Sequence, residues 1–203
     1  MALSHRLPDN ERNAVGLLLG LLRTGEQSAH VAFRRLSRRL PPASTRYVHH
    51  ALSSIAIDEA THDQWLATAA ASAGISASPA PVGVRRFFVR LESRDIRIHL
   101  VRIAALDACV CQILSCVLAL RRPSCIPPAL IAALAAIRKD EAVHVRTTRG
   151  LARDFGVDPV AAHALELDTR GEFGLVLAHY GAAFDALGLD TEMLQRRISR
   201  RDP

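Results

Sequence analysis

Two copies of one short motif carry the residues of this sequence that are best suited to binding a metal ion. The motif reads DEATH over Asp58–His62 and DEAVH over Asp140–His144, so that in each copy a glutamate precedes a histidine by three residues. On a helix, residues three apart lie on the same face, one turn from each other. Carboxylates and imidazoles are ligands of iron and manganese. Because one Glu-x-x-His occurs easily by chance, the surrounding pattern decides whether the motif has a function.

Four predicted helices each place a carboxylate on an apolar stripe, where a leucine would be expected. The positions on these stripes are three and four residues apart, as in the buried face of a helix. Two stripes contain the motifs: Leu52, Ile55, Glu59, His62 and Leu66, and Ile137, Glu141, His144, Thr148 and Leu151. The other two place Glu26 between Leu22 and Ala29, and Asp107 between Ile103 and Val110. We therefore predict that all four helices bury a carboxylate near their middle.

The two halves of the chain repeat this order with nearly equal spacing. Glu59 follows Glu26 by 33 residues, and Glu141 follows Asp107 by 34 residues. An antiparallel hairpin of two such helices brings its mid-helix residues to the same level. Burying ionisable groups without compensation costs several kcal/mol per ion, and two divalent metal ions would remove that cost. The predicted metal ligands are Glu26, Glu59, His62, Asp107, Glu141 and His144.

The elements that must position these residues are all helical. Apolar periodicity predicts helices over about 10–39, 44 or 45 to 72, 94–120, 128–156 and 159–187. The last of them is expected to break at Gly171 or Gly174, and a short polar tail follows Gly188. The longest connection, about 73–93, contains a basic segment that can form a short helix over 84–90. We predict an all-α single domain over residues 1–203, with a four-helix bundle over about 10–156, a long crossover between its second and third helices, and an additional C-terminal helix.

This arrangement resembles the ferritin-like superfamily of carboxylate-bridged diiron proteins over about residues 11–155. In that superfamily the first and third helices each supply one carboxylate, and the second and fourth supply Glu-x-x-His. The resemblance implies two bridging glutamates, two terminal carboxylates and two imidazoles that bind one metal each: Glu59 and Glu141, Glu26 and Asp107, and His62 and His144.

Residues beside the predicted ligands have supporting roles. The resemblance implies that Asp58 and Asp140 orient the metal-bound imidazoles through hydrogen bonds. His30 lies one turn after Glu26 and is expected behind the ligands, with a role as a seventh ligand as the alternative. Asp107 departs from the usual glutamate, and Gln112 is the substitute if the register of that helix differs.

The resemblance implies two bound iron ions, or a manganese–iron pair, with O2 as co-substrate. We expect a diiron oxygenase or oxidase that hydroxylates or N-oxygenates a small organic substrate and takes electrons from an external donor. The alternatives are a ferroxidase or peroxide-scavenging protein of the ferritin or rubrerythrin type, and a tRNA-modifying hydroxylase or a non-enzymatic metal-binding bundle. An apolar pocket would favour the organic substrate, and an acidic path for iron would favour the ferroxidase.

Several residue types narrow these alternatives. Rubrerythrins carry paired iron-binding cysteines, and no such pairs occur among Cys109, Cys111, Cys116 and Cys125. Aromatic residues make up 4% of the chain, which leaves few rings to stack on RNA bases. Four polar residues of the last long helix match no ligand spacing and are predicted at the surface: His163, Glu166, Glu172 and His179.

Charge and hydropathy indicate a cytoplasmic protein. The net charge is +6, Lys139 is the only lysine, and arginines gather where helices are predicted to end. Because cations at helix C-termini are favoured by the helix dipole, we do not expect a nucleic-acid partner. The apolar run Val15–Leu22 is shorter than the roughly 20 residues of a membrane span, so no membrane association is expected. A homodimer is compatible with the sequence.

Overall fold

The computed structural model describes residues 8–40, 45–120 and 126–199, and these residues form helices without any strand. Ser44 and Cys125, which were named above, lie outside this part. The helices are α1 (Asp9–Arg39), α2 (Arg46–Ser72), α3 (Val82–Leu91), α4 (Ile96–Leu118), α5 (Pro128–Asp154), α6 (Pro159–Ala178), α7 (Gly181–Ala186) and α8 (Thr191–Ser199). The predicted all-α class is confirmed.

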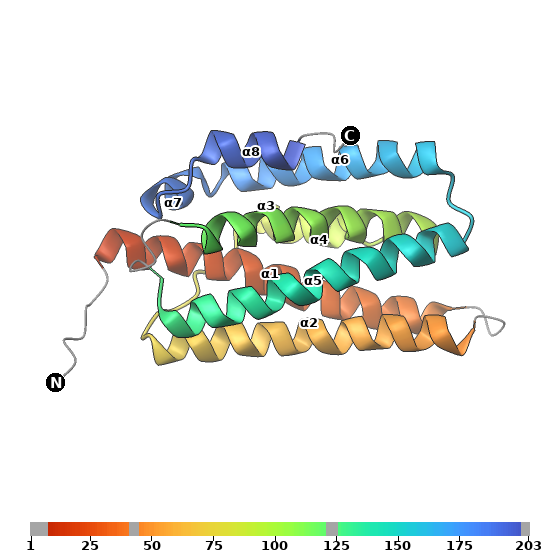
Figure 1. Ribbon diagram of the computed structural model, residues 1–203, viewed down its shortest axis with the longest axis horizontal. Coiled ribbons are helices and arrows are strands. Elements are labelled where there is room, and N and C mark those ends of the chain that lie inside the picture. The colour runs from red at the N-terminus through yellow and green to blue at the C-terminus, as the bar shows by residue number, and fades with distance from the viewer. Residues whose placement is uncertain (1–7, 41–44, 121–125, 200–203) are drawn as a thin grey trace.

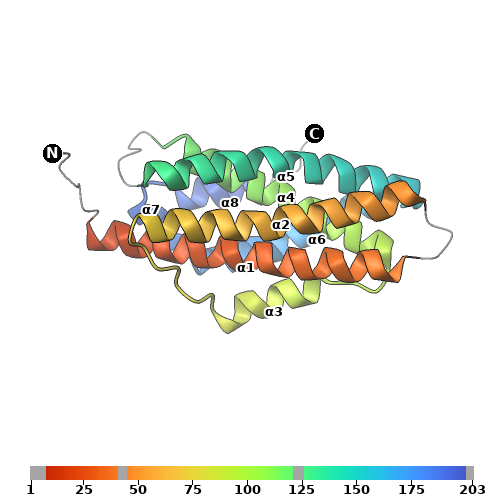
Figure 2. The ribbon, with the colours of Figure 1, turned by 90° about the horizontal axis from the view of Figure 1, so that it is seen from below.

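Four long helices form the bundle that positions the candidate site. α1 and α2 make one antiparallel pair, α4 and α5 make the other, and α2 packs against α5 (Figure 1). The predicted crossover connects α2 to α4 and contains α3, which lies beside α1 outside the layer of the long helices (Figure 2). The four-helix arrangement and the short crossover helix therefore agree with the sequence analysis.

Local sequence signals explain where the bundle helices begin. The side chains of Thr45 and Asp95 accept hydrogen bonds from backbone N–H groups in the first turns of α2 and α4, as N-cap residues do. Pro128 is the first residue of α5, where a missing N–H costs nothing. These starts set the register that brings the mid-helix carboxylates to one level.

The C-terminal region differs from the sequence prediction. One helix over 159–187 was expected to break at Gly171 or Gly174, but α6 continues through both glycines and ends at Ala178. A glycine costs a helix only about 1 kcal/mol, and the packing of α6 against α4 outweighs that cost. The expected polar tail contains α8, whose Leu194 and Ile198 are buried. Tertiary contacts hold the apolar face of α8 against the rest of the protein.

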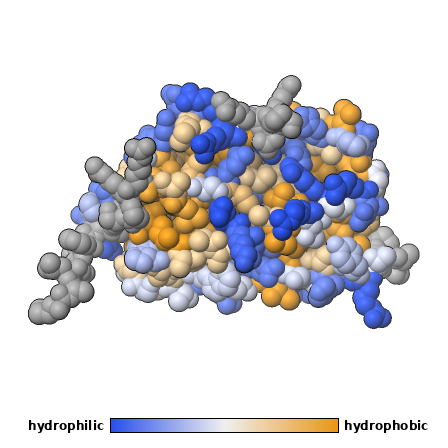
Figure 3. Space-filling model, in the orientation of Figure 1, coloured by the Kyte–Doolittle hydropathy of each residue, from blue (hydrophilic) through white to orange (hydrophobic). Residues whose placement is uncertain are grey.

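α4 is the most apolar helix of the bundle and lies inside it. By length and composition alone it could cross a membrane, but 67% of its most apolar window is buried in the protein. Hydrophilic side chains lie in the middle of the face shown in Figure 3 as well as at its edges. The apolar composition of α4 is thus that of a core helix that packs against α3, α5, α6 and α8.

Two glycines of α1 allow the crossover to pass close to that helix. The backbone N–H of Ser78 donates a hydrogen bond of 2.8 Å to the carbonyl oxygen of Gly16. A Cβ atom on Gly20 would lie 1.8 Å from the carbonyl oxygen of Ser78, and one on Gly16 would lie 2.8 Å from that of Ser76. The crossover therefore packs directly on the α1 backbone, and this contact fixes where α3 begins.

A layer of ionisable side chains divides the hydrophobic core into two clusters. One cluster contains Leu22 and Leu66, and the other contains Ala29 and Ile55. Glu26 lies between the two clusters along α1, and the Glu-x-x-His pair of α2 lies between them along α2. The two apolar clusters on either side of the layer hold the helices together, so that the fold does not depend on the polar layer for its stability.

Replacing Gly20 by alanine should destabilise the protein, because the added Cβ would collide with a backbone oxygen that cannot rotate away. We expect the free energy of unfolding to fall by about 2–3 kcal/mol, measured by urea denaturation. Gly150→Ala is the matched control, because a Cβ there meets nothing within 4 Å. That variant should be stabilised by about 0.5–1 kcal/mol. Equal effects at the two positions would contradict the close packing of the crossover.

His99 is a buried ionisable group outside the polar layer, and it packs against Phe33 of the cluster that contains Ala29 and Ile55. Its ring makes an edge contact with Phe33, with centroids 6.2 Å apart, and its Nδ1 accepts a hydrogen bond from the backbone N–H of Ser93. Burial lowers the pKa of His99 from 6.5 to about 4. The folded protein therefore holds this imidazole neutral at pH values where the unfolded chain protonates it.

Stability should consequently fall as the pH drops from about 6.5 to about 4, because the unfolded state binds the extra proton. Over this pH range, the shifted pKa of His99 changes the free energy of unfolding by about 3 kcal/mol. His99→Gln keeps an acceptor for the Ser93 N–H but does not titrate. Urea denaturation at pH 7.5 and 4.5 should show a smaller loss of stability in the variant than in the parent. A loss of the same size in both proteins would show that His99 does not contribute.

Candidate metal centre

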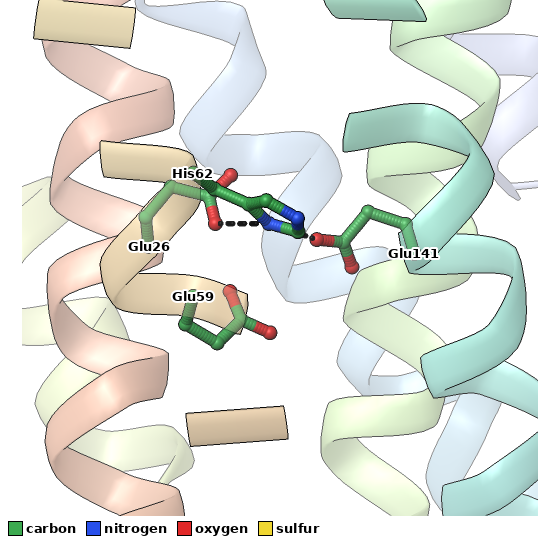
Figure 4. Close-up of side chains that lie close together, drawn as sticks. All are labelled: Glu26, Glu59, His62 and Glu141. Atoms are coloured by element: carbon green, nitrogen blue, oxygen red, sulfur yellow. Dashed lines mark hydrogen bonds and ion pairs between the residues drawn. The ribbon is translucent and has the colours of Figure 1, made fainter. Parts of the chain in front are cut away.

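The six predicted ligands converge in the middle of the bundle. Each is between 1% and 5% exposed, although all six are ionisable. Their ligand atoms fall into two groups in which the atoms lie within 4.8 Å of one another, and Glu141 belongs to both: Glu26, Glu59, His62 and Glu141, and Asp107, Glu141 and His144. Figure 4 shows the first group, with side chains from α1 and α2 pointing toward Glu141 of α5.

Each imidazole points one nitrogen at the carboxylates and the other at an aspartate. His62 Nδ1 lies 3.2 Å from Glu26 Oε2, while its Nε2 lies 3.3 Å from Asp140 Oδ2. His144 Nε2 likewise lies 3.3 Å from Asp58 Oδ2. In the neutral ring, a carboxylate beside Nε2 fixes the proton there, so that the Nδ1 lone pair is directed at the centre of the bundle.

The aspartates act across the bundle, each on the histidine of the opposite motif. Asp140 of α5 contacts His62 of α2, and Asp58 of α2 contacts His144 of α5. The two imidazole rings stack on each other with centroids 5.8 Å apart. This crossed arrangement links α2 to α5 at the level of the site and satisfies both Nε2 atoms.

The carboxylates of the layer do not share one protonation state. Burial raises the pKa of Glu26, Glu59 and Asp107 well above the ordinary value, and repulsion from the Glu141 charge raises it further. Burial acts on Glu141 in the same direction, but hydrogen bonds from His144 and His62 outweigh it and lower its pKa. Protonation is therefore favoured most at Glu26, Glu59 and Asp107 and least at Glu141, and a bound cation would displace protons from the layer.

For the two imidazoles, the surroundings favour the charged form. Burial favours the neutral form of both rings, but hydrogen bonds and charge interactions with the carboxylates outweigh it. The pKa of His62 is raised, and that of His144 is raised to about 12. In the absence of a cation, the protonated imidazoles thus compensate the carboxylate charge of the layer.

The donor set and its spacing fit metal ions. Two ligands on one ion with bonds of about 2.1 Å at a right angle stand about 3.0 Å apart, and His144 Nδ1 lies 3.1 Å from Glu59 Oε1. Asp107 Oδ2 is buried and makes no hydrogen bond among the described residues. A buried carboxylate oxygen without a hydrogen bond, beside other donors at ligand spacing, is what a metal ion would satisfy. Four carboxylates also balance the charge of two divalent ions.

Other residues named from the sequence lie away from this cluster. His30 Nδ1 lies 2.6 Å from the backbone carbonyl oxygen of Ala56, so the ring joins α1 to α2 instead of contacting the six side chains. Asp107 of α4 belongs to one of the ligand groups, as the predicted register requires, and Gln112 is half-buried on the same helix. Of the polar residues on α6 and after it, Glu166 pairs with Arg149 and three are exposed: His163, Glu172 and His179.

Three aromatic residues near the site were not singled out by the sequence analysis. The Trp65 ring lies 5.6 Å from that of His62 between centroids, and Trp65 is 39% exposed. Phe88 of α3 and Phe173 of α6 line a cavity against the carboxylates. Trp65 follows His62 by three residues, so helical spacing could have identified it. The positions of Phe88 and Phe173 depend on how α3 and α6 pack.

The fold was compared with those of known proteins. No protein-family model matches the chain, and no curated protein matches it. A solved structure described as protein 19 with aldehyde deformylating oxidase activity from Synechococcus matches with a TM-score of 0.74. The match covers 95% of this chain and 88% of that chain, at 18% sequence identity. This chain has the ferritin-like fold.

The ferritin-like fold accounts for the order in which the helices supply the cluster. The first and third long helices, α1 and α4, each contribute one carboxylate, and α2 and α5 each contribute Glu-x-x-His. This is the arrangement by which ferritin-like bundles hold two metal ions. The buried Glu and His cluster of this chain could hold a metal ion in the same part of the bundle.

Replacing Asp140 by asparagine should weaken metal binding about 10- to 100-fold, because the Nε2 proton of His62 would lose its charged acceptor. Trp65 is the only tryptophan, so quenching of its fluorescence by Co²⁺ can report the titration. Asp63→Asn is the control, because Asp63 pairs with Arg23 at 2.6 Å and has no contact with either imidazole ring among the described interactions. If both substitutions weakened binding equally, the crossed pairs would not be the cause.

Proposed function

We propose that this protein is a non-haem diiron oxygenase or oxidase that uses O2 to oxidise a small organic substrate. The observation that carries the proposal is an apolar cavity directly against the carboxylate layer. Glu26, Glu59, Asp107 and Glu141 form one side of it, and its remaining lining residues are uncharged and almost all hydrophobic. A metal centre that opens onto such a cavity is suited to a small apolar reactant.

The cavity is small and largely apolar. Its volume is about 30 Å³, which is room for roughly two molecules of the size of water or O2. Phe88 and Phe173 stand on the side contributed by α3 and α6, with Val110 and Ile113 on α4. These apolar side chains lower the local polarity beside the carboxylates, so that charges there interact more strongly than they would in water.

The chain's own residues prepare the centre for this chemistry. The crossed aspartates hold the two imidazoles with Nδ1 directed inward, and Glu141, which belongs to both ligand groups, would help to hold both ions. Two iron ions held here would supply the electrons with which O2 is reduced. An external electron donor that restores the reduced state is part of this proposal.

The lining of the cavity favours an organic reactant over the ferroxidase alternative. A route for iron would need acidic side chains leading inward, whereas the lining outside the carboxylate layer carries no charge. The aldehyde deformylating oxidase activity of the structural neighbour supports the oxidase class. At 18% identity, its aldehyde substrate is not transferred to this chain.

Anaerobic loading with Fe²⁺ tests the proposal. Plasma mass spectrometry should find about two irons per chain, lost in Glu59→Ala and Glu141→Ala and kept in Glu166→Ala, whose carboxylate pairs with Arg149 outside the site. On mixing with O2 in a stopped-flow instrument, the loaded protein should oxidise only its bound iron and then require a reductant. Repeated oxidation of added Fe²⁺ would indicate a ferroxidase, and failure to bind iron would refute the metal centre.

A further inference from the structure

A surface groove lies on the outer side of one cavity wall. It runs between α1 and α3, has a volume of about 350 Å³, and shares Phe88 with the inner cavity. A groove of this size falls within the range of small-molecule sites. Phe88 is the one residue that lines both the groove and the cavity, so its ring separates the metal layer from the surface on this side.

The backbone of α1 leaves room for this ring. A Cβ atom added to Gly25 would lie 3.5 Å from Phe88 Cζ, which places the ring directly over a glycine that precedes the predicted ligand Glu26. Displacement of one phenylalanine side chain would therefore join the groove to the cavity. Rotation of a side chain at the edge of a core is a much smaller change than the separation of two helices.

The groove differs from the cavity in its charge. Arg35 and Arg85 line it, and Glu92 is its only carboxylate. Arg35 and Arg39 both bind Glu92, at 2.8 Å and 3.3 Å, so that one carboxylate is shared by two guanidinium groups. Arg85 donates a hydrogen bond only to a backbone carbonyl oxygen, that of Ala80, among the described contacts. The groove consequently keeps an excess of positive charge.

Apolar side chains also line the groove, next to Phe88. Val89 is 73% exposed and Val31 is 43% exposed, and both line the groove beside Phe88. Exposed valines gain free energy when an alkyl chain covers them. The groove thus combines positive charge with apolar side chains, beside the polar residues Thr24, Gln27 and Ser28, and it borders the apolar cavity at Phe88.

The geometry points to an anionic amphiphile as the substrate class: a molecule whose acidic head group binds Arg85 and Arg35 and whose apolar chain passes Phe88 toward the metal layer. This inference rests on the proposed function, because it names the substrate of the same site. The apolar end of the molecule, rather than its head group, is then presented to the metals. Phe88 is the residue that admits the chain.

Binding of three probes with one alkyl chain tests the head-group preference. Isothermal titration of the metal-free protein with decanoate, decan-1-ol and decyltrimethylammonium should give the tightest binding for decanoate, by about tenfold over the cation. Arg85→Gln should remove most of that preference. Arg86→Gln is the matched control, because Arg86 is exposed on the same helix and does not line the groove. Equal affinity for all three probes would overturn the inference.

A second pair of variants avoids the risk of unfolding. Val89→Glu places a carboxylate in the groove at an exposed position, and should weaken decanoate binding about tenfold without weakening that of decyltrimethylammonium. Val82→Glu is its control, because Val82 is 52% exposed on α3 outside the groove. Loss of decanoate binding in both variants, or in neither, would place the ligand elsewhere.

The orientation of the chain can be measured with bound Mn²⁺. Its paramagnetism should broaden the NMR signal of the terminal methyl group of decanoate more than that of the methylene beside the carboxylate. Stronger broadening at the methylene would place the head group at the metals and overturn the inference.

If the protein binds no Mn²⁺ or Fe²⁺, the proposed function fails, and the titrations of metal-free protein still decide whether the groove selects an anion. If metal binds but decanoate does not, only this inference fails.

Discussion

The structure depends on burying six ionisable side chains in one layer of a helical bundle. Without partners, such groups would cost several kcal/mol each. Here the imidazoles and carboxylates compensate one another, and the two aspartates extend this compensation to the edge of the layer. Because Asp58 and Asp140 each reach the histidine of the opposite motif, the arrangement requires α2 and α5 to be neighbours. The polar layer therefore specifies which helices pair as well as what they can bind.

Stability comes from the apolar clusters on either side of this layer. Leu22 and Leu66 belong to one cluster, and Phe33 and Leu52 to the other. The bundle tolerates the buried ionisable layer in its middle because the hydrophobic core on each side of that layer stabilises the fold. A metal ion would add its binding free energy to the folded state alone, which makes the metal-free protein the less stable form.

The elements outside the bundle give the centre its surroundings. The crossover packs on the glycines of α1 and thereby places α3, whose Phe88 covers the carboxylate layer. α6 packs against α4 and contributes Phe173 to the same cavity. The four ligand-bearing helices alone would leave the centre open on this side. The additional helices therefore control what reaches the centre, while the ferritin-like bundle supplies the centre itself.

The sequence by itself determined the fold class and which residues form the cluster. Helical periodicity is local, and a carboxylate such as Glu26 or Asp107 on an apolar stripe can be recognised from its neighbours along the chain. Only the tertiary structure decided which aspartate meets which histidine, that α6 continues through Gly171, and that Phe88 lines the cavity. These features depend on contacts between residues far apart in the sequence, and the side chains involved carry no local pattern that reveals their partners.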